Sequence, residues 1–182
     1  KRECEVVLLE AMPNLLPSFK EPLSKITKKY LEDMGVNVLV GSQVTDIQNE
    51  TVFFAGESAE GKIESKTIIW GAGVMASVMG KVLADSTGAE LDRVGRVLVN
   101  KDFSIPKYDD IFVIGDLARL KNDGKYLPGI ATVAMQSGRF VANLIKNRAQ
   151  GKDYKKEFRY KDKGLLAVIG RNKAVADLGF FS

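Results

Sequence analysis

Acidic and glycine residues stand at the ends of three apolar stretches, where they could bind parts of a nucleotide. Glu10 follows residues 6–9, Gly71-Ala72-Gly73 follows 67–70, and Gly115-Asp116 follows 111–114. In α/β proteins, ligands bind at the carboxyl ends of parallel strands. A carboxylate there can accept hydrogen bonds from ribose hydroxyls, and a glycine loop lets the backbone approach a phosphate. The three places therefore indicate nucleotide binding.

Each place also has a plainer interpretation. The run Gly71-Ala72-Gly73-Val74-Met75-Ala76 matches the phosphate-binding pattern G-x-G-x-x-A. The pattern requires a strand that ends in a ribose-binding acid about 20 residues further on. The strand found there ends at Asn100, so a glycine-rich domain crossover is favoured. Glu10 fits a ribose ligand or a solvated acid equally well, and Asp116 fits a ligand-binding carboxylate or a turn residue.

The composition excludes several kinds of active site. The 182 residues contain no histidine, which rules out Ser-His-Asp and Cys-His catalysis and histidine metal ligands. The single Cys4 rules out an intrachain disulfide, a CxxC redox pair and a cysteine-rich zinc site, and we expect it to be a small core residue. We predict no catalytic side chain and no metal site. One cysteine fits reduced, cytoplasm-facing surroundings, and a net charge of +4 does not argue for nucleic acid.

Hydrophobic periodicity predicts an α/β chain. Strands over 5–10 and 36–40 flank a helix over 22–34, which makes a βαβ unit. Short strands over 43–48, 51–55 and 62–70, with turn residues between them, predict a β-meander. Beyond it we expect a short helix or irregular stretch over 77–84, strands over 95–99 and 111–114, a helix over 130–148, and a hairpin of strands 165–169 and 174–178. No apolar stretch approaches the roughly 20 residues of a membrane span.

Residues 146–163 form a basic tract. They hold eight basic and three acidic residues, 8 − 3 = +5, which exceeds the net charge of the whole chain. A solvated linker is the favoured interpretation and proximity to anionic lipid the next. RNA binding is disfavoured because the few aromatic residues are not arranged as a stacking platform.

Taken in order, several motifs resemble those of the type II NADH dehydrogenases, the single-subunit NADH:quinone oxidoreductases. The family belongs to the flavoproteins with two dinucleotide-binding domains. The resemblance covers nearly the whole chain, and its most specific parts are the Ala-x-x-Ala-x-Gln start of the long helix and the Asp-Lys-Gly…Ile-Gly-Arg tail. The motifs are Glu10 at its strand end, 67–74, 92–97, 111–118, 131–138 and 160–171.

The resemblance implies the cofactors FAD and NAD(H) and a role for each matching residue. NADH would pass a hydride to FAD, and the electrons would go on to a quinone. Asp116 would bind the FAD ribityl chain, with Gly115 allowing close approach, and the backbone of Ala131, Thr132 and Val133 would face the flavin ring. Gln136 would lie near the quinone, Glu10 would bind the NADH adenosine ribose, and Gly71, Ala72 and Gly73 would lie near the nicotinamide.

The resemblance also implies a partial Rossmann-like fold and a division of the chain. Residues 1–73 would be the second part of the NAD(H)-binding domain, 74–150 the C-terminal part of the FAD-binding domain, and 151–182 the start of a membrane- and quinone-side region. The family's two N-terminal glycine fingerprints are missing, and the sequence opens in mid-pattern at Lys1. We therefore expect a fragment of a respiratory-chain oxidoreductase that is cytoplasmic or peripheral on the cytoplasmic face of the membrane.

Thr132 departs from the family pattern, which has Gln at that position, and so the quinone stays unassigned. Two alternatives remain open: a related flavoprotein reductase with a different acceptor, and a non-catalytic truncated domain. The single cysteine argues against sulfide chemistry for the first. Exposed sheet edges would favour the second, because they predict pairing between copies or with the missing half.

Overall fold

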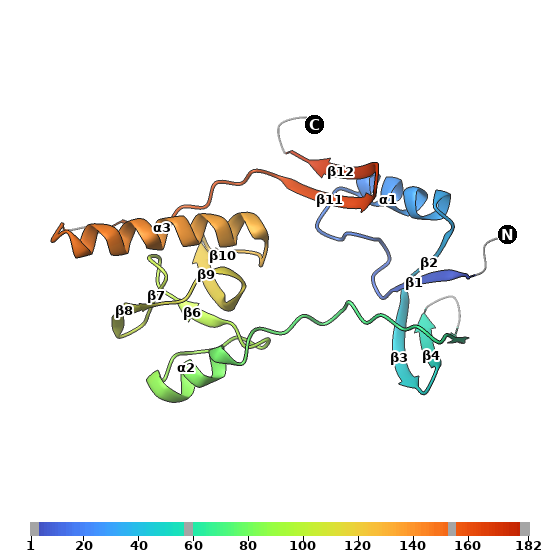
Figure 1. Ribbon diagram of the computed structural model, residues 1–182, viewed down its shortest axis with the longest axis horizontal. Coiled ribbons are helices and arrows are strands. Elements are labelled where there is room, and N and C mark those ends of the chain that lie inside the picture. The colour runs from blue at the N-terminus through green and yellow to red at the C-terminus, as the bar shows by residue number, and fades with distance from the viewer. Residues whose placement is uncertain (1–3, 57–59, 153–155, 179–182) are drawn as a thin grey trace. The chain divides into compact units, whose positions relative to one another are not determined.

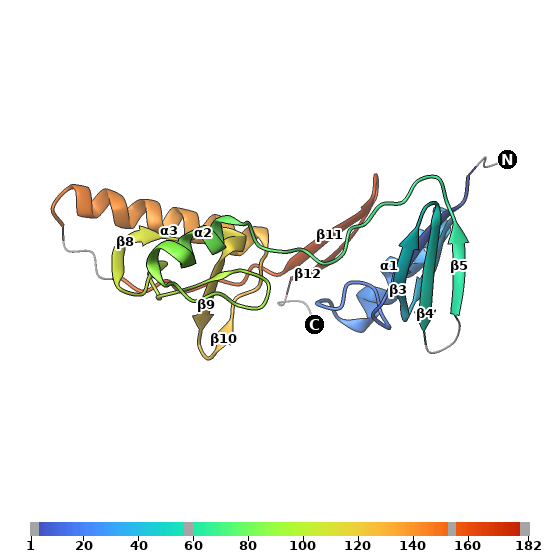
Figure 2. The same cartoon turned by 90° about the horizontal axis from the view of Figure 1, so that it is seen from below.

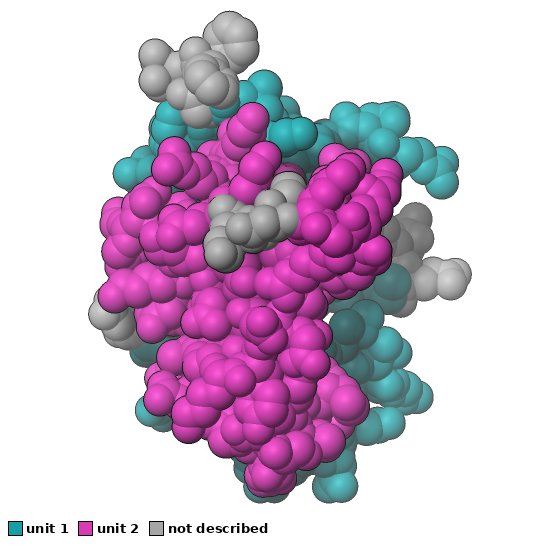
Figure 3. Space-filling view, turned by 90° about the vertical axis from the view of Figure 1, so that its left-hand side faces the viewer, with its two compact units in different colours: residues 1–70, 163–182 teal, residues 71–162 magenta. Residues whose placement is uncertain are grey.

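The computed structural model describes residues 4–56, 60–152 and 156–178, and the chain forms two compact units (Figure 1). Unit 1 comprises Lys1–Trp70 and Lys163–Ser182, and unit 2 comprises Gly71–Asp162 (Figure 3). The functional division into 1–73, 74–150 and 151–182 stays a prediction, and 153–155 and 179–182 of its last region lie outside the described residues. No helix in the described ranges is long and apolar enough to cross a membrane.

The predicted βαβ unit is present in unit 1. β1 (Val6–Glu10) pairs in parallel with β2 (Val36–Val40), with Glu10 opposite Val40 at the carboxyl ends. α1 (Glu21–Asp33) connects them, and a proline in its first turn is tolerated because an N–H there would lack an intrahelical partner. Gly35, at φ 85°, follows the helix and turns the chain into β2.

The predicted β-meander is also present, but its last strand is shorter than expected. β3 (Ser42–Gln48), β4 (Thr51–Gly56) and β5 (Glu60–Glu64) form an antiparallel sheet in that order (Figure 2). The expected extension to Trp70 is wrong. The Ser65 hydroxyl donates to the Thr67 carbonyl (2.9 Å) and accepts from the Thr67 N–H (3.3 Å), and such local bonds compete with a strand ladder.

The predicted C-terminal hairpin packs on α1 within unit 1. β11 (Leu165–Gly170) pairs antiparallel with β12 (Lys173–Asp177). Lys173 Nζ lies 3.3 Å from an Asp33 carboxylate oxygen and 4.6 Å from the centre of the Tyr30 ring. A Cβ at Gly170 would lie 2.8 Å from the Met34 sulfur, so the absence of a side chain lets the hairpin lie close to the helix.

Unit 2 is built around a small sheet and one long helix. β6, β9 and β10 form a three-stranded sheet in the order β10-β9-β6, in which β6 and β9 are parallel. The helix predicted over 130–148 is confirmed as α3. The elements of unit 2 are α2 (Met79–Thr87), β6 (Val97–Val99), β7 (Ser104–Ile105), β8 (Tyr108–Phe112), the 3-10 turn η1 (Gly115–Leu117), β9 (Ala118–Asn122), β10 (Lys125–Tyr126) and α3 (Ala131–Ala149).

The strand predicted over 111–114 is only partly correct. β8 starts earlier and ends at Phe112, because it pairs antiparallel with β7 in a short hairpin in which Ile105 lies opposite Tyr108. The next N–H, from Val113, still bonds the Phe103 carbonyl (3.0 Å). Ile114 is then 42% exposed, so the apolar run leaves the core before it reaches Gly115.

Three aromatic rings hold α3 to the rest of unit 2. Phe158 makes edge contacts with Phe103 and Phe140, with ring centres 4.9 and 5.6 Å apart. Phe103 and Phe158 are 1% and 5% exposed. Phe158 lies in the tract interpreted from the sequence as a solvated linker, so that interpretation is wrong at this residue because the ring is a core residue.

We expect Phe158→Ala to lower the free energy of unfolding by about 3–5 kcal/mol, since it removes a buried ring and leaves a cavity. Urea unfolding followed by circular dichroism measures the change. Met135→Ala is the control, because Met135 is 56% exposed on the same helix and should cost about 0.5 kcal/mol or less. Equal losses for the two variants would contradict a core role for Phe158.

Candidate functional site

A hollow of about 360 Å³ opens on unit 2, which is within the usual size of ligand pockets. Three segments form its wall: the stretch that leads into α2, the turn before β6, and η1 with the glycine that precedes α3. It is lined by Val74, Met75, Ala76, Ser77, Val94, Arg96, Asp116, Leu117 and Gly129. Asp116 is the one predicted site residue that lines it.

Close packing between η1 and α3 positions Asp116. Gly115 adopts φ 67°, which favours glycine, and its N–H donates to the buried Ser137 hydroxyl of α3 (3.3 Å). A Cβ at Gly115 would lie 3.8 Å from the Ala134 Cβ, and one at Gly129 would lie 3.6 Å from Asp116 Oδ1. The Asp116 carboxylate therefore lies beside the residues that lead into α3.

The start of α3 presents backbone donors next to this carboxylate. Ile130 is extended and precedes the helix, no side chain caps it, and the first turn contains no acid. The first helical bonds run from the N–H groups of Val133 and Ala134 to the Ile130 carbonyl (3.0 and 3.1 Å). The N–H groups of Ala131 and Thr132 have no acceptor within the helix, and they carry the positive end of its dipole. This turn suits an electron-rich ligand atom.

Gln136 lies one turn further along α3, and its side chain makes two hydrogen bonds to the backbone of Lys161. Its amide nitrogen donates to the Lys161 carbonyl (2.9 Å), and its amide oxygen accepts from the Lys161 N–H (3.0 Å). Thr132 Oγ1 lies 2.9 Å from the Tyr160 hydroxyl. Sequence reasoning missed Tyr160 and Lys161 as neighbours of the site, since no local pattern pairs residues so far apart along the chain.

An ionic cluster that the sequence did not reveal stiffens one wall of the hollow. Asp92 accepts hydrogen bonds from the Val94 and Arg96 N–H groups (3.0 and 2.9 Å) and from Arg96 Nε (2.8 Å), with Arg119 Nε 3.4 Å away. Burial acts to raise the pKa of Asp92, but the hydrogen bonds from Arg96 and Val94 outweigh it, and the pKa is lowered. The cluster fixes Val94 and Arg96, which line the hollow.

Gly71, Ala72 and Gly73 lie at the start of unit 2 in exposed chain without regular structure. No strand directly precedes them, and α2 begins only at Met79. Gly73 has φ 70°, and a Cβ at Gly71 would touch nothing within 4 Å. The strand–loop–helix geometry of a phosphate loop is therefore not formed, and a role near nicotinamide stays a prediction.

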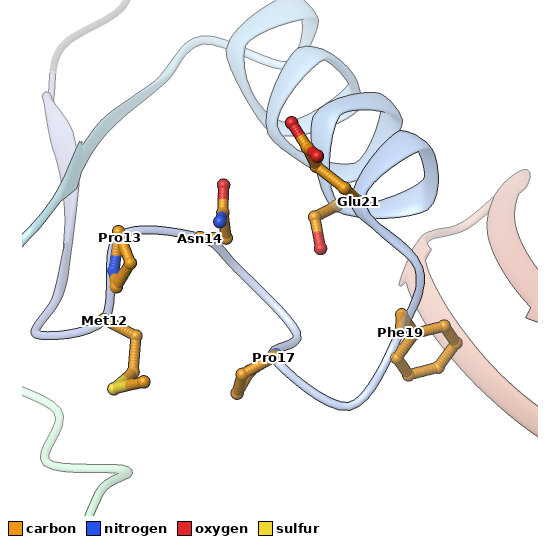
Figure 4. A pocket seen from close by; sticks show the side chains of 7 residues that line it. Met12, Pro13, Asn14, Pro17, Phe19 and Glu21 are labelled. Carbon is orange, nitrogen blue, oxygen red and sulfur yellow. The ribbon is translucent and has the colours of Figure 1, made fainter.

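Glu10 lies in unit 1, whereas the other predicted residues belong to unit 2. Its carboxylate, at the end of β1, accepts the Met12 N–H (2.8 Å) and holds the start of the loop that leads to α1. This loop curls around a hollow of about 160 Å³ (Figure 4). Met12, Pro13, Asn14 and Pro17 line it from the loop, and Glu21 lines it from the first turn of α1.

The described residues hold no metal-binding cluster of three or more His, Cys, Asp or Glu side chains. Cys4 is exposed, so the expectation of a core cysteine is wrong. It precedes β1 and lies outside the pairing with β2, which begins at Val6.

Comparison with known proteins identifies relatives of this chain. Residues 1–138 match the family model described as pyridine nucleotide-disulphide oxidoreductase. Over 97% of its length, the chain is 37% identical to the type II NADH:quinone oxidoreductase Ndh of Mycobacterium tuberculosis, of which it covers 38%. Over 94% of its length, it is 32% identical to the type II NADH:quinone oxidoreductase of Staphylococcus saprophyticus, of which it covers 42%. The chain thus spans about two fifths of these relatives.

Solved structures share the fold. NDH2 from Plasmodium falciparum in complex with NADH superposes with a TM-score of 0.82 at 17% identity, over 97% of this chain and 50% of that one. Reduced CoADR-RHD of Bacillus anthracis superposes with a TM-score of 0.72 at 20% identity, over 92% of this chain and 29% of that one. At such low identity these likenesses concern the fold alone.

We expect Asp92→Asn to lower the free energy of unfolding near neutral pH by about 1.5–3 kcal/mol, the usual worth of hydrogen bonds to a charged group. Because the folded pKa is lowered, the stabilisation by Asp92 is complete above the unfolded pKa of about 3.9 and is lost as the pH falls through the folded pKa. Urea titrations from neutral pH down into the acid range should show the wild-type advantage shrinking. Asp85→Asn, from an exposed pair with Lys81, is the control, and a loss independent of pH would contradict the prediction.

Proposed function

Because this chain belongs to the pyridine nucleotide-disulphide oxidoreductase family, we propose that it is part of a flavin-dependent NADH:quinone oxidoreductase. The observation that carries the proposal is the juxtaposition of Asp116 with the uncapped start of α3, in a chain similar to type II NADH:quinone oxidoreductases. The relatives' activity is proposed for this chain, because the chain spans about two fifths of their length.

The residues around Asp116 fit one part of FAD. The exposed carboxylate can accept hydrogen bonds from ribityl hydroxyls, and the missing side chains at Gly115 and Gly129 leave room beside it. The N–H groups of Ala131 and Thr132, with the backbone of Val133, would face the electron-rich edge of the flavin ring. Bound FAD would supply the redox chemistry by accepting a hydride from NADH and giving two electrons to a quinone.

The protein groups in this proposal bind and orient, and none transfers a proton. Glu10 would hold the adenosine ribose of NADH, and Gly71, Ala72 and Gly73 would lie on the nicotinamide side. Gln136 would stand at the quinone end, where its bonds to Lys161 shape the site. In the whole protein, the basic residues of 146–163 would face anionic lipid on the cytoplasmic side of a membrane, where quinones dissolve.

A related flavoprotein reductase with a different acceptor is the second candidate, because the chain also shares its fold with CoADR-RHD. A redox cysteine pair cannot come from these 182 residues, which contain one cysteine. The quinone acceptor is therefore favoured. A non-catalytic domain is the third candidate and is distinguished by its failure to retain flavin.

FAD retention tests the proposal directly. The purified chain is incubated with FAD and desalted, and we expect it to keep the visible flavin absorbance band. Asp116→Asn should weaken FAD binding about 10- to 100-fold, since it removes a charged hydrogen-bond acceptor. Asp110→Asn, the same charge change at another exposed aspartate of unit 2, should leave binding unchanged. If the chain keeps no flavin, the proposal is contradicted and the non-catalytic domain becomes the favoured candidate.

Nucleotide preference tests the assignment of Glu10. A carboxylate accepts hydrogen bonds from the ribose 2′-hydroxyl and repels a 2′-phosphate, so we expect tighter binding of NADH than of NADPH. Glu10→Gln should lower the ratio of the NADPH to the NADH dissociation constant about tenfold or more. Glu50→Gln, in an exposed turn of the same unit, should leave this ratio unchanged. Titration of the fluorescence of either nucleotide gives both dissociation constants, and an unchanged preference in Glu10→Gln would remove Glu10 from the site.

A further inference from the structure

The hollow beside the loop that leads into α1 belongs to unit 1, and Figure 4 shows it between this loop and the first turn of the helix. Its volume is about 160 Å³, and an apolar cavity of about 150 Å³ is large enough to hold benzene. Two of the lining residues are prolines, whose rings fix the backbone and carry no N–H group. The residues that line the hollow are Met12, Pro13, Asn14, Pro17, Phe19, Glu21 and Ser24. The loop side of the hollow is therefore mostly apolar and stiff.

Three hydrogen bonds hold the loop in this shape. The Met12 N–H donates to the Glu10 carboxylate (2.8 Å), and the Met12 carbonyl accepts from the Gly41 N–H (2.9 Å). Further along, the Phe19 N–H donates to the Leu16 carbonyl (2.9 Å) and closes a turn. A ligand would enter the hollow without first having to order the loop, which lowers the entropic cost of binding.

One polar side chain of the hollow is buried without a hydrogen-bond partner. Ser24 is 3% exposed, and its hydroxyl makes no hydrogen bond within residues 4–56, 60–152 and 156–178. The other buried hydroxyl residues of these ranges, Thr27, Ser104 and Ser137, each donate a hydrogen bond. A buried hydroxyl without a partner costs free energy, which a ligand atom bonded to it would recover. Because Ser24 lines the hollow, a ligand there can supply the partner.

Glu21, in the first turn of α1, adds a negative charge to the same hollow. Its Oε1 lies 2.7 Å from Lys25 Nζ, and the hydrogen bond and charge of Lys25 lower the pKa of Glu21, which is therefore ionised at neutral pH. A carboxylate accepts several hydrogen bonds, so Glu21 can take a second donor beside Lys25. Its full charge exceeds the partial positive charge of the helix start, so the hollow favours cations over anions.

We propose that this hollow binds a small apolar amine, with the apolar part against the prolines and the ammonium group at Ser24 and Glu21. An ammonium group has three donors and no acceptor, so it can donate to the Ser24 hydroxyl oxygen and to the Glu21 carboxylate together. The two residues are three positions apart on α1, which places them on one face of the helix. The site goes beyond the proposed function, because all its residues belong to unit 1 and Glu10 does not line it.

Three probes that share one benzene ring test the proposal on the whole chain. Benzylamine is a cation at neutral pH, toluene is uncharged, and benzoate is an anion. Each is titrated into the chain while amide NMR signals are followed, and we expect benzylamine to bind most tightly and benzoate most weakly. Addition of NADH should not displace benzylamine, because Glu10 does not line the hollow.

Variants assign the two polar contacts. Ser24→Ala should weaken benzylamine binding about tenfold, the usual effect of losing one hydrogen bond to a charged group, without weakening toluene binding. Ser86→Ala, at an exposed serine of unit 2, is its control. Glu21→Gln should weaken benzylamine binding only about three- to fivefold, because Glu21 is 65% exposed. Glu32→Gln, at an exposed pair further along α1, should change nothing, and Lys25→Met should strengthen binding by removing a competing cation.

The stability of the variants separates a ligand-binding role of Ser24 from a structural one. Since its hydroxyl has no partner in the described chain, Ser24→Ala should leave the urea midpoint unchanged or raise it. A lowered midpoint with equal losses for benzylamine and toluene would indicate packing and overturn the proposal. A wild-type chain that binds toluene as tightly as benzylamine, or that releases benzylamine when NADH is added, would also overturn it. None of these outcomes bears on FAD retention, so the proposed function fails or stands separately.

Discussion

The contact between η1 and α3 is the constraint on which the candidate site depends. The Ser137 hydroxyl accepts the Gly115 N–H and donates to the Ala134 carbonyl (2.9 Å), and Ser137 is completely buried. Gly115 can take its left-handed conformation at little cost because it has no Cβ. A side chain at Gly115 would strain the backbone at φ 67°, although its Cβ would lie in ordinary contact, 3.8 Å from the Ala134 Cβ. One short contact thus sets the distance between the carboxylate and the backbone donors.

Two opposite charges lie next to this contact. The uncapped start of α3 contributes partial positive charge, and Asp116 contributes a full negative charge beside it. On the neighbouring wall, Asp92 engages both Arg96 and Arg119, so two cations are held by one carboxylate. Such an arrangement can bind a ligand that has hydroxyl groups at one end and electron-rich atoms at the other. Under the proposed function, the bond-breaking chemistry would belong to the bound cofactor.

The sequence predicts this fold well where the pattern is local and poorly where distant contacts decide. The βαβ unit, the hairpin and α3 follow from periodicity, glycine and proline positions that tertiary contacts do not override. The strand expected to reach Trp70 ends early because Ser65 satisfies the backbone of Thr67 locally. Asp116 is predicted from the acid after an apolar run. Tyr160 is not, because 28 residues separate it from Thr132, and the buried Phe158 ring and the Gln136–Lys161 hydrogen bonds bring the two together.

The cysteine content of this chain differs from what the name of its family suggests. The matched family is named for disulphide oxidoreductases, yet these 182 residues contain one cysteine, and it is exposed. Two proteins can share a fold and still use different reacting groups, because the fold places residues in space and does not determine which residue types stand there. What this scaffold positions is a carboxylate, a helix start and a hydroxyl pair within one unit. All three can act by hydrogen bonding and charge, so under the proposed function the choice of ligand would depend on which ligand atoms can accept or donate a hydrogen bond at each place.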